Sequence, residues 1–192
     1  GILGVMCASG KLVFAADPSP QTAFHLIEME GVTTSALVPP LAQAWVASAE
    51  KRGVSLPSLQ TLQVGGSKLA PAVAGKIESV LGCTVQQVFG MAEGLVNYTR
   101  STDPIEMRLR TQGYPISPDD EILIVDDQDQ PVKRGESGHL LTRGPYTIRG
   151  YYLEENANRY GFTEDGFYRT GDIVRPVSYT HLTLPAKRIV EI

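Results

Sequence analysis

The first 90 residues alternate strand-like with helix-like segments, and this alternation restricts the fold more than any other feature of the sequence. Predicted strands cover 33–38, 59–64 and 84–89, predicted helices cover 20–30, 39–52 and 71–81, and 11–15 is a further short, strand-like apolar segment. Strands separated by helices of about 10–15 residues are typical of βαβ units, which build a parallel sheet. Ligands bind outside the carboxyl ends of such strands. The sequence therefore predicts an α/β fold with its site after residues 64 and 89.

After residue 99 the pattern changes to short strands separated by turns. Residues 121–125 and 138–142 are compact apolar strands, and the sequence Asp-Asp-Gln-Asp at 126–129 is typical of a hairpin turn. We therefore expect two portions, an α/β portion over residues 1–99 and a small antiparallel β portion over residues 100–175.

Charge and composition exclude several classes of partner. Lys and Arg number 17 against 21 Asp and Glu, so the net charge of −4 provides no broad basic surface for nucleic acid. No apolar run reaches the ~18–20 residues of a membrane helix, so no membrane partner is expected. Two cysteines, Cys7 and Cys83, cannot form a disulfide framework and favour a reducing compartment, the cytoplasm. The histidines stand far apart, without a Cys or His partner at metal-ligand spacing.

Paired glycines follow the predicted strand 59–64. Gly65 and Gly66 allow the backbone to approach a ligand closely, and the N-terminus of the helix that begins at Pro71 favours anions. An ordinary strand-to-helix turn has the same composition, so the glycine pair alone does not define a site.

An aromatic ring and a carboxylate end the strand 84–89. Phe89 offers a flat face for a base or an aryl ring, and Gly90 leaves room beside it. Glu93 lies between small residues at the sheet edge, where it can hold a divalent cation that bridges phosphate oxygens. The alternative interpretation is a buried aromatic residue and a solvated glutamate.

A third candidate lies near the end of the chain. Asp172 completes the sequence Tyr-Arg-Thr-Gly-Asp, and its carboxylate can accept two hydrogen bonds from a ribose diol. An aspartate that caps its own turn would have the same surroundings in sequence. Residues 143–152 contain three tyrosines, which either bind a ligand or, more commonly for such residues, pack the small sheet.

Together and in this order, the segments resemble the adenylate-forming superfamily of acyl- and aryl-acid ligases. Residues 87–94, Gln-Val-Phe-Gly-Met-Ala-Glu-Gly, match its adenine-and-metal segment, with Phe for the usual Tyr and Ala for the usual Thr. Residues 135–141 match its Gly-Glu-x-Gly-x-Leu strand, and 168–172 match its ribose-binding motif without a departure. The Phe and Ala variants are similar to the branch that activates 2,3-dihydroxybenzoate for catecholate siderophores. The resemblance covers about residues 4–175.

The resemblance implies a role for each matching residue. The residues that would contact ATP are Gly66, Val88, Phe89 and Asp172. The residues that would line the aryl pocket are Gly90, Ala92 and Val96. Glu93 would bind Mg²⁺, Phe89 would flank adenine and Asp172 would hold the ribose hydroxyls. No residue of the chain is assigned a catalytic role.

The implied reaction joins the carboxylate of 2,3-dihydroxybenzoate to the α-phosphate of ATP, releases pyrophosphate, and passes the acyl group to a phosphopantetheine thiol on an aryl carrier protein. It needs ATP and Mg²⁺ but no nucleophile from the protein, because positioning and charge neutralisation dominate. Two alternatives stay open. One is another ligase of the superfamily, which activates salicylate, an amino acid or a fatty acid, and the other is a nucleotide-binding protein without catalysis.

The sequence also departs from the family pattern at both ends. The family's phosphate loop and its aryl-binding Asn segment would precede Gly1, and its hinge and C-terminal domain with the catalytic Lys would follow the chain. After Arg175 the hinge pattern is replaced by residues 176–192, which look like translated sequencing-adapter sequence. We therefore expect an internal fragment that is inactive by itself and ends in a non-native tail.

Overall fold

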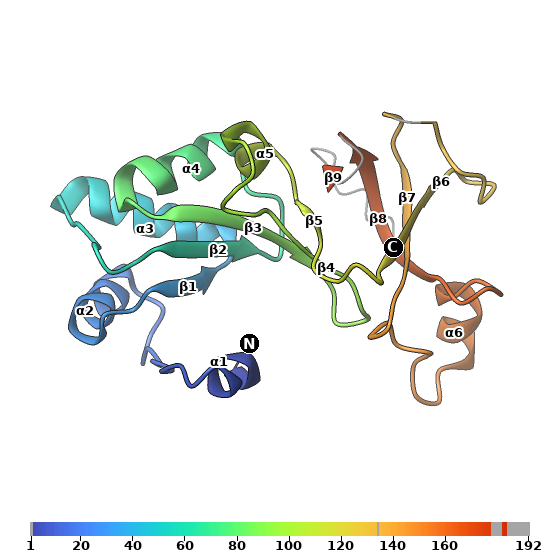
Figure 1. Cartoon of the computed structure of the whole chain (residues 1–192), viewed down its shortest axis with the longest axis horizontal. Helices are drawn as coiled ribbons and strands as arrows, with labels where there is room; N and C mark the ends of the chain where they lie inside the picture. Colours follow the sequence, from blue (N-terminus) through green and yellow to red (C-terminus); the bar gives the residue numbers. More distant parts are fainter. Residues whose placement is uncertain (1, 134, 178–181, 184–192) are drawn as a thin grey trace.

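The computed structural model describes residues 2–133, 135–177 and 182–183. The described strands form two sheets, one with the strand order β1-β2-β3-β4-β5 and one with the order β6-β7-β8-β9. Figure 1 shows the sheets next to each other along the long axis of the molecule, with α3 and α4 over one face of the first sheet. The predicted α/β fold with a small antiparallel portion is confirmed.

The first three strands are parallel, as the βαβ pattern predicts. They are β1 (Thr34–Leu37), β2 (Thr61–Gly65) and β3 (Thr84–Gly90). The helix α2 (Pro20–Glu30) begins after Ser19, whose hydroxyl accepts a hydrogen bond from the Thr22 amide. The helix α3 (Pro39–Arg52) begins with two prolines, which suit the first turn because that turn has no partners for its amides. A short helix, α1 (Ile2–Cys7), precedes these elements.

Two local predictions differ from the structure. The helix expected over 71–81 is divided into α4 (Pro71–Lys76) and a π-helical stretch, η1 (Ile77–Leu81). Both Ile77 and Leu81 are buried, so the wider turn still directs its apolar side chains into the core. The segment 11–15 forms no strand, because it pairs with no other strand in the described residues and a short isolated strand is not stable.

The first sheet continues beyond the parallel strands. The strands β4 (Val96–Tyr98) and β5 (Tyr114–Pro115) add to it in antiparallel pairing, and α5 (Ile105–Arg110) packs near β3. The chain therefore passes from the first sheet to the second between Pro115, where β5 ends, and Glu121, where β6 begins. A division into domains near residue 99 remains a prediction.

The second sheet is antiparallel throughout. Its strands are β6 (Glu121–Val125), β7 (Gly138–Arg143), β8 (Tyr168–Pro176) and β9 (Leu182–Thr183). The helix α6 (Glu155–Gly161) lies between β7 and β8 in the chain. Most of the tail 176–192 that was expected to be non-native lies outside the described residues, so this expectation stays a prediction.

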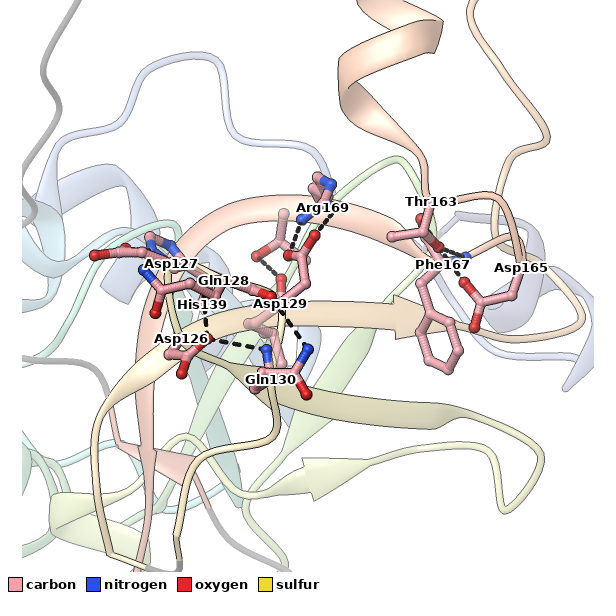
Figure 2. A network of polar contacts seen from close by, with 12 residues as sticks. Asp126, Asp127, Gln128, Asp129, Gln130, His139, Thr163, Asp165, Phe167 and Arg169 are labelled. Atoms are coloured by element: carbon pink, nitrogen blue, oxygen red, sulfur yellow. Dashed lines mark hydrogen bonds and ion pairs between the residues drawn. The ribbon is translucent and has the colours of Figure 1, made fainter.

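Charged side chains hold the turn after β6 on β8. Figure 2 shows Arg169 beside Asp129, and both guanidinium NH₂ groups donate to its two carboxylate oxygens at 2.6 Å. These hydrogen bonds lower the pKa of Asp129 below its ordinary value. At the same turn, the His139 Nε2 atom lies 2.9 Å from a carboxylate oxygen of Asp127. Arg169 lies in β8, the strand that contains the ribose-motif residues 168–172. The ion pair therefore joins the turn to this ribose-motif strand.

The core contains a large cluster, a smaller one at the junction of the sheets and a third within the second sheet. In the large cluster, the rings of Phe24 and Trp45 meet edge to face with centroids 5.3 Å apart. The smaller cluster contains residues from both sheets, namely Phe89, Leu95, Leu140 and Val174. Apolar packing therefore connects the end of β3 with β7 and β8. In the part of the chain that the structure describes, no helix is long and apolar enough to cross a membrane.

Candidate functional site

The predicted nucleotide residues of the first sheet lie at the carboxyl ends of its strands. Gly65, the last residue of β2, pairs with Val88 of β3. Gly66 follows with a φ of 87°, a backbone conformation that residues other than glycine rarely adopt. Because Gly66 follows directly on the pair of Gly65 and Val88, the structure brings Gly66 and Val88 to one edge of the sheet. Their contact with ATP remains a prediction.

The three predicted aryl-pocket residues surround the turn that joins β3 to β4. Gly90 pairs with Val96 across the two strands, and a Cβ atom on Gly90 would lie 3.3 Å from the Val96 Cγ2 atom. Ala92 is exposed in the turn between them. The three therefore form a small, apolar region in which Val96 has the largest side chain.

The Phe89 ring lies in the apolar cluster between the sheets, beside Leu140 and Val174, and is only 8% exposed. Its packing fixes the end of β3 against the second sheet. The sequence pattern left open whether this ring is buried or binds a ligand, and the structure shows that most of it is buried. A contact of its remaining surface with adenine stays a prediction.

The turn that carries Glu93 is attached to the loop that follows β7. The Ile148 amide donates a hydrogen bond of 2.8 Å to the Glu93 carbonyl oxygen. The Tyr151 hydroxyl donates another, of 2.9 Å, to the Glu93 Oε1 atom. The loop 144–151 thus holds both the backbone and the carboxylate of Glu93.

A second tyrosine extends this contact to the ribose-motif strand. The hydroxyl oxygens of Tyr151 and Tyr168 lie 3.0 Å apart, and Tyr168 is the first residue of β8. Burial of the hydroxyl group and its hydrogen bond to the Glu93 carboxylate raise the pKa of Tyr151 above its ordinary value. Tyr151 therefore stays protonated at neutral pH and acts as a hydrogen-bond donor. Glu93 is in this way linked to the strand that bears Asp172.

Asp172 lies in a bulge of β8. Leu141 pairs with Arg169 and His139 pairs with Ile173, so the single residue between the β7 partners faces three residues of β8, 170–172. The Asp172 amide donates to the Thr170 hydroxyl oxygen at 3.1 Å. A bulge of this kind redirects a side chain relative to the regular strand. The Asp172 side chain is largely buried, and its bond to ribose remains a prediction.

The donor set around Glu93 fits Mg²⁺ that is bound mainly by a nucleotide. The described residues contain no group of three or more His, Cys, Asp or Glu side chains that could hold a metal by themselves. Mg²⁺ usually keeps several waters and takes one or two carboxylates together with substrate phosphates. A single partly exposed carboxylate such as Glu93 is therefore a suitable protein ligand.

The tyrosines of 143–152 have three different environments, which the sequence did not distinguish. Tyr151 reaches Glu93, whereas Tyr152 is 89% exposed. Tyr146 donates to a carboxylate oxygen of Asp120, and burial together with this contact raises the pKa of Tyr146. Their only sequence signal was the presence of aromatic residues in a loop after a predicted strand.

A separate cavity of about 680 Å³ lies beside the edge strand β1 of the first sheet. It is lined by α1, residues 10–18, α2 and the edge strand β1, and it contains none of the predicted site residues. Its position beside an edge strand, away from the carboxyl end of β3, does not match the ligand position that parallel sheets favour. We therefore do not assign the nucleotide to this cavity.

Comparison with known proteins agrees with the order of the motifs. Residues 1–152 match the family described as AMP-binding enzyme. The chain is 61% identical over 175 residues to the 2,3-dihydroxybenzoate-AMP ligase of Bacillus subtilis, and the match covers 91% of this chain and 32% of that protein. It is 55% identical over 176 residues to a salicylyl-CoA synthase / salicylate adenylyltransferase of a Streptomyces species, with 91% and 32% covered.

A solved structure gives the same result for the fold. The apo structure of MbtA from Mycobacterium smegmatis superposes with a TM-score of 0.89 at 48% identity, covering 96% of this chain and 34% of that one. The chain thus spans about a third of the length of the relatives that it matches. The match over residues 1–152, most of the chain, shows that this protein belongs to the AMP-binding enzyme family.

Proposed function

We propose that the complete protein is an ATP-dependent acid–AMP ligase that activates 2,3-dihydroxybenzoate. The carboxylate oxygen of the acid attacks the α-phosphorus of ATP, the bond to the β-phosphate oxygen breaks, and pyrophosphate leaves. The phosphopantetheine thiol of an aryl carrier protein then attacks the acyl carbon, loses its proton, and displaces AMP. The product would enter catecholate siderophore assembly in the cytoplasm.

The contact between Glu93 and Tyr151, which continues to Tyr168, is the observation that carries this proposal. A metal ligand and a ribose ligand serve one nucleotide only if their segments meet. Glu93 lies in the turn between β3 and β4 of the first sheet, and Asp172 lies in β8 of the second. The tyrosine contact joins this turn to β8. This arrangement supports a single nucleotide site between the sheets.

The proposed roles follow from residue chemistry. Asp172 would accept hydrogen bonds from the ribose hydroxyls, and Gly66 and Val88 would lie against the nucleotide. Glu93 would hold Mg²⁺, which when bound supplies neutralisation of phosphate charge. Gly90, Ala92 and Val96 would leave space for a flat ring. Phe89 would contribute an edge or face of its ring to adenine.

Salicylate is a second candidate substrate, because a relative that is 55% identical is named as a salicylate adenylyltransferase. It differs from 2,3-dihydroxybenzoate by one hydroxyl group. An amino acid is disfavoured, since the half-buried, apolar Val96 offers no countercharge for an ammonium group.

The test is acid-dependent exchange of pyrophosphate into ATP by the complete protein, with kcat/KM compared across a panel of acids. We expect 2,3-dihydroxybenzoate to rank first and salicylate second, with amino acids far below. A standard amino acid above both benzoates would contradict the substrate assignment. Binding of ATP without exchange for any acid would favour a nucleotide-binding protein without catalysis. The 192-residue chain alone should show no exchange, because it spans 32% of its relative.

A further inference from the structure

The hydroxyl groups of Tyr168, Tyr151 and the carboxylate of Glu93 form a continuous row. The Tyr151 hydroxyl oxygen lies 2.9 Å from the Glu93 Oε1 atom and 3.0 Å from the Tyr168 hydroxyl oxygen. The three residues come from the turn after β3, the loop after β7 and the beginning of β8. A contact made by three separate segments exists only in the folded protein.

The direction of the hydrogen bonds follows from the number of protons. An ionised carboxylate can only accept, so Tyr151 must donate its single proton to Glu93. Tyr151 then has none left for Tyr168, and Tyr168 must donate to the Tyr151 oxygen. Bonds that point in one direction polarise each other, and a bond to an ionised acceptor is stronger than a neutral one.

The backbone of Tyr151 is held by one asparagine. The Asn158 Oδ1 atom accepts a hydrogen bond from the Tyr151 amide at 2.6 Å, and the Asn158 Nδ2 atom donates to the Tyr151 carbonyl at 2.8 Å. Asn158 belongs to α6, so a helix fixes the place of this residue in the loop.

The rings of both tyrosines pack against Phe162. Its centroid lies 6.2 Å from that of Tyr151 and 5.3 Å from that of Tyr168. With the backbone and the ring both held, the Tyr151 hydroxyl has little freedom other than rotation of its proton. Such a donor can keep a carboxylate in one orientation at a small cost in side-chain entropy.

The neighbouring Tyr152 has a contrasting position. It is 89% exposed, and no hydrogen bond of its hydroxyl group is observed within the described residues. Loss of the Tyr152 hydroxyl therefore provides a matched control for loss of the Tyr151 hydroxyl.

From this geometry we infer that Tyr151 is a positioning residue for the metal ligand Glu93, with Tyr168 supporting it from the ribose-motif strand. The inference rests on the proposed function, because that function assigns the metal to Glu93. Because Tyr151 engages Oε1, the Oε2 atom of Glu93 would be left available to hold the cation. The turn that carries Glu93 and the strand that carries Asp172 are thereby held in a fixed arrangement.

The test compares Tyr151→Phe with Tyr152→Phe in the complete protein. Groups that orient a metal ligand typically alter metal affinity by 10–100-fold, so we expect Tyr151→Phe to raise the half-saturating Mg²⁺ concentration of the exchange reaction about 10-fold. The KM for the aryl acid should change less than about twofold, because a hydroxyl that acts only through Glu93 does not change the affinity for the aryl acid. Tyr152→Phe should match the wild type. Equal Mg²⁺ requirements for the two variants would overturn the inference.

A second measurement does not depend on turnover. Binding of Mn²⁺ in the presence of a non-hydrolysable ATP analogue, followed by electron paramagnetic resonance, should weaken in Tyr151→Phe and, to a smaller extent, in Tyr168→Phe. Glu93→Gln should abolish most of this binding, and Tyr151→Phe should add nothing to it in the double variant. Effects that multiply in the double variant would mean that Tyr151 acts independently of Glu93.

The two proposals fail in different ways. If the wild type shows no acid-dependent exchange with any acid, the proposed function fails, and the Mn²⁺ measurement still decides whether Tyr151 orients Glu93. If the wild type is active and Tyr151→Phe equals Tyr152→Phe in both measurements, only the positioning role fails. Should Tyr151→Phe not fold, Tyr168→Phe tests the same row of hydrogen bonds, and an unchanged Mn²⁺ affinity there would contradict it.

Discussion

Gly94 packs so closely against Thr147 that a Cβ atom on Gly94 would lie 2.4 Å from the Thr147 Cα atom. Cβ atoms do not approach other backbones to this distance, so a residue with a side chain would force the two segments apart. The contact lies next to the hydrogen bond between Ile148 and Glu93. The turn of the first sheet and the loop of the second are thus attached at the proposed metal ligand.

The first prediction concerns this contact. Gly94→Ala should lower the free energy of unfolding by about 2–3 kcal/mol, because it combines a backbone clash with a φ of 146°. Gly31→Ala is the control, since Gly31 also has a positive φ, of 63°, but no atom lies within 4 Å of its added Cβ. Its cost should be about 1–2 kcal/mol. Urea unfolding of the complete protein measures both, and equal costs would show that the contact with Thr147 is unimportant.

The second prediction separates nucleotide binding from aryl-acid binding. Hydrogen bonds to a charged group contribute roughly 1.5–3 kcal/mol, so Asp172→Ala should raise the KM for ATP about 10–100-fold. The KM for the aryl acid should change much less. Asp119→Ala is a suitable control, because Asp119 is exposed and belongs to no candidate site. Equal losses for ATP and acid would assign Asp172 a structural role.

The third prediction concerns an ion pair that attaches α5 to η1. The Arg108 NH₂ group donates to both carboxylate oxygens of Glu78 at 3.0 Å, and the two side chains are only 15% and 19% exposed. Glu78→Gln should cost about 2–3 kcal/mol of stability, because a largely buried guanidinium would lose its countercharge.

The control for this ion pair is Glu106→Gln on α5. Glu106 pairs with Arg110 one helical turn away, but these side chains are 71% and 65% exposed. Exposed pairs of this spacing contribute about 0.3–0.5 kcal/mol, so the control should hardly change the urea midpoint. A cost for Glu78→Gln as small as that for Glu106→Gln would mean that water replaces the ion pair.

The fourth prediction concerns pH. Burial raises the pKa of the Cys83 thiol from its ordinary value of 9.0 to about 11. A group with a raised pKa in the folded state retains its proton there while the unfolded chain loses it. The stabilising effect is therefore complete below pH 9 and is lost as the pH rises from about 9 to about 11.

Two measurements check the behaviour of Cys83. Cys83→Ala should flatten the decline of stability over that pH interval in urea titrations. At pH 8, a thiol reagent should label the exposed Cys7 rapidly and the buried Cys83 only after unfolding. Rapid labelling of both thiols in the native protein would contradict the burial of Cys83, which is the cause of its raised pKa.

Local signals in the sequence predicted the parallel portion closely. The helices α2 and α3 begin at prolines and end before Gly31 and Gly53, so their ends follow from single residues. The strands of this portion differ from their predicted limits by only one or two residues. These features depend on neighbours within a few positions, which a sequence pattern displays directly.

Other elements could not be predicted because their partners are distant. The short strands β4 and β5 carry no distinctive pattern, and they exist because β3 offers an edge to pair with. The bulge at 170–172 arises from the register between β7 and β8, which neither strand specifies alone. The π-helical turn η1 depends likewise on how its apolar residues meet the core.

The sequence by itself determined the parallel βαβ order, the positions of the candidate carboxylates Glu93 and Asp172, and, through the order of its motifs, the family. Only the tertiary structure decided that Glu93 is bound by Tyr151, which lies 58 positions away, and that Tyr168 extends this contact to the strand of Asp172. A hydrogen bond over such a separation forms when packing brings two surfaces together. No local propensity of either residue specifies its partner, because the partner is chosen by the contact between the two sheets.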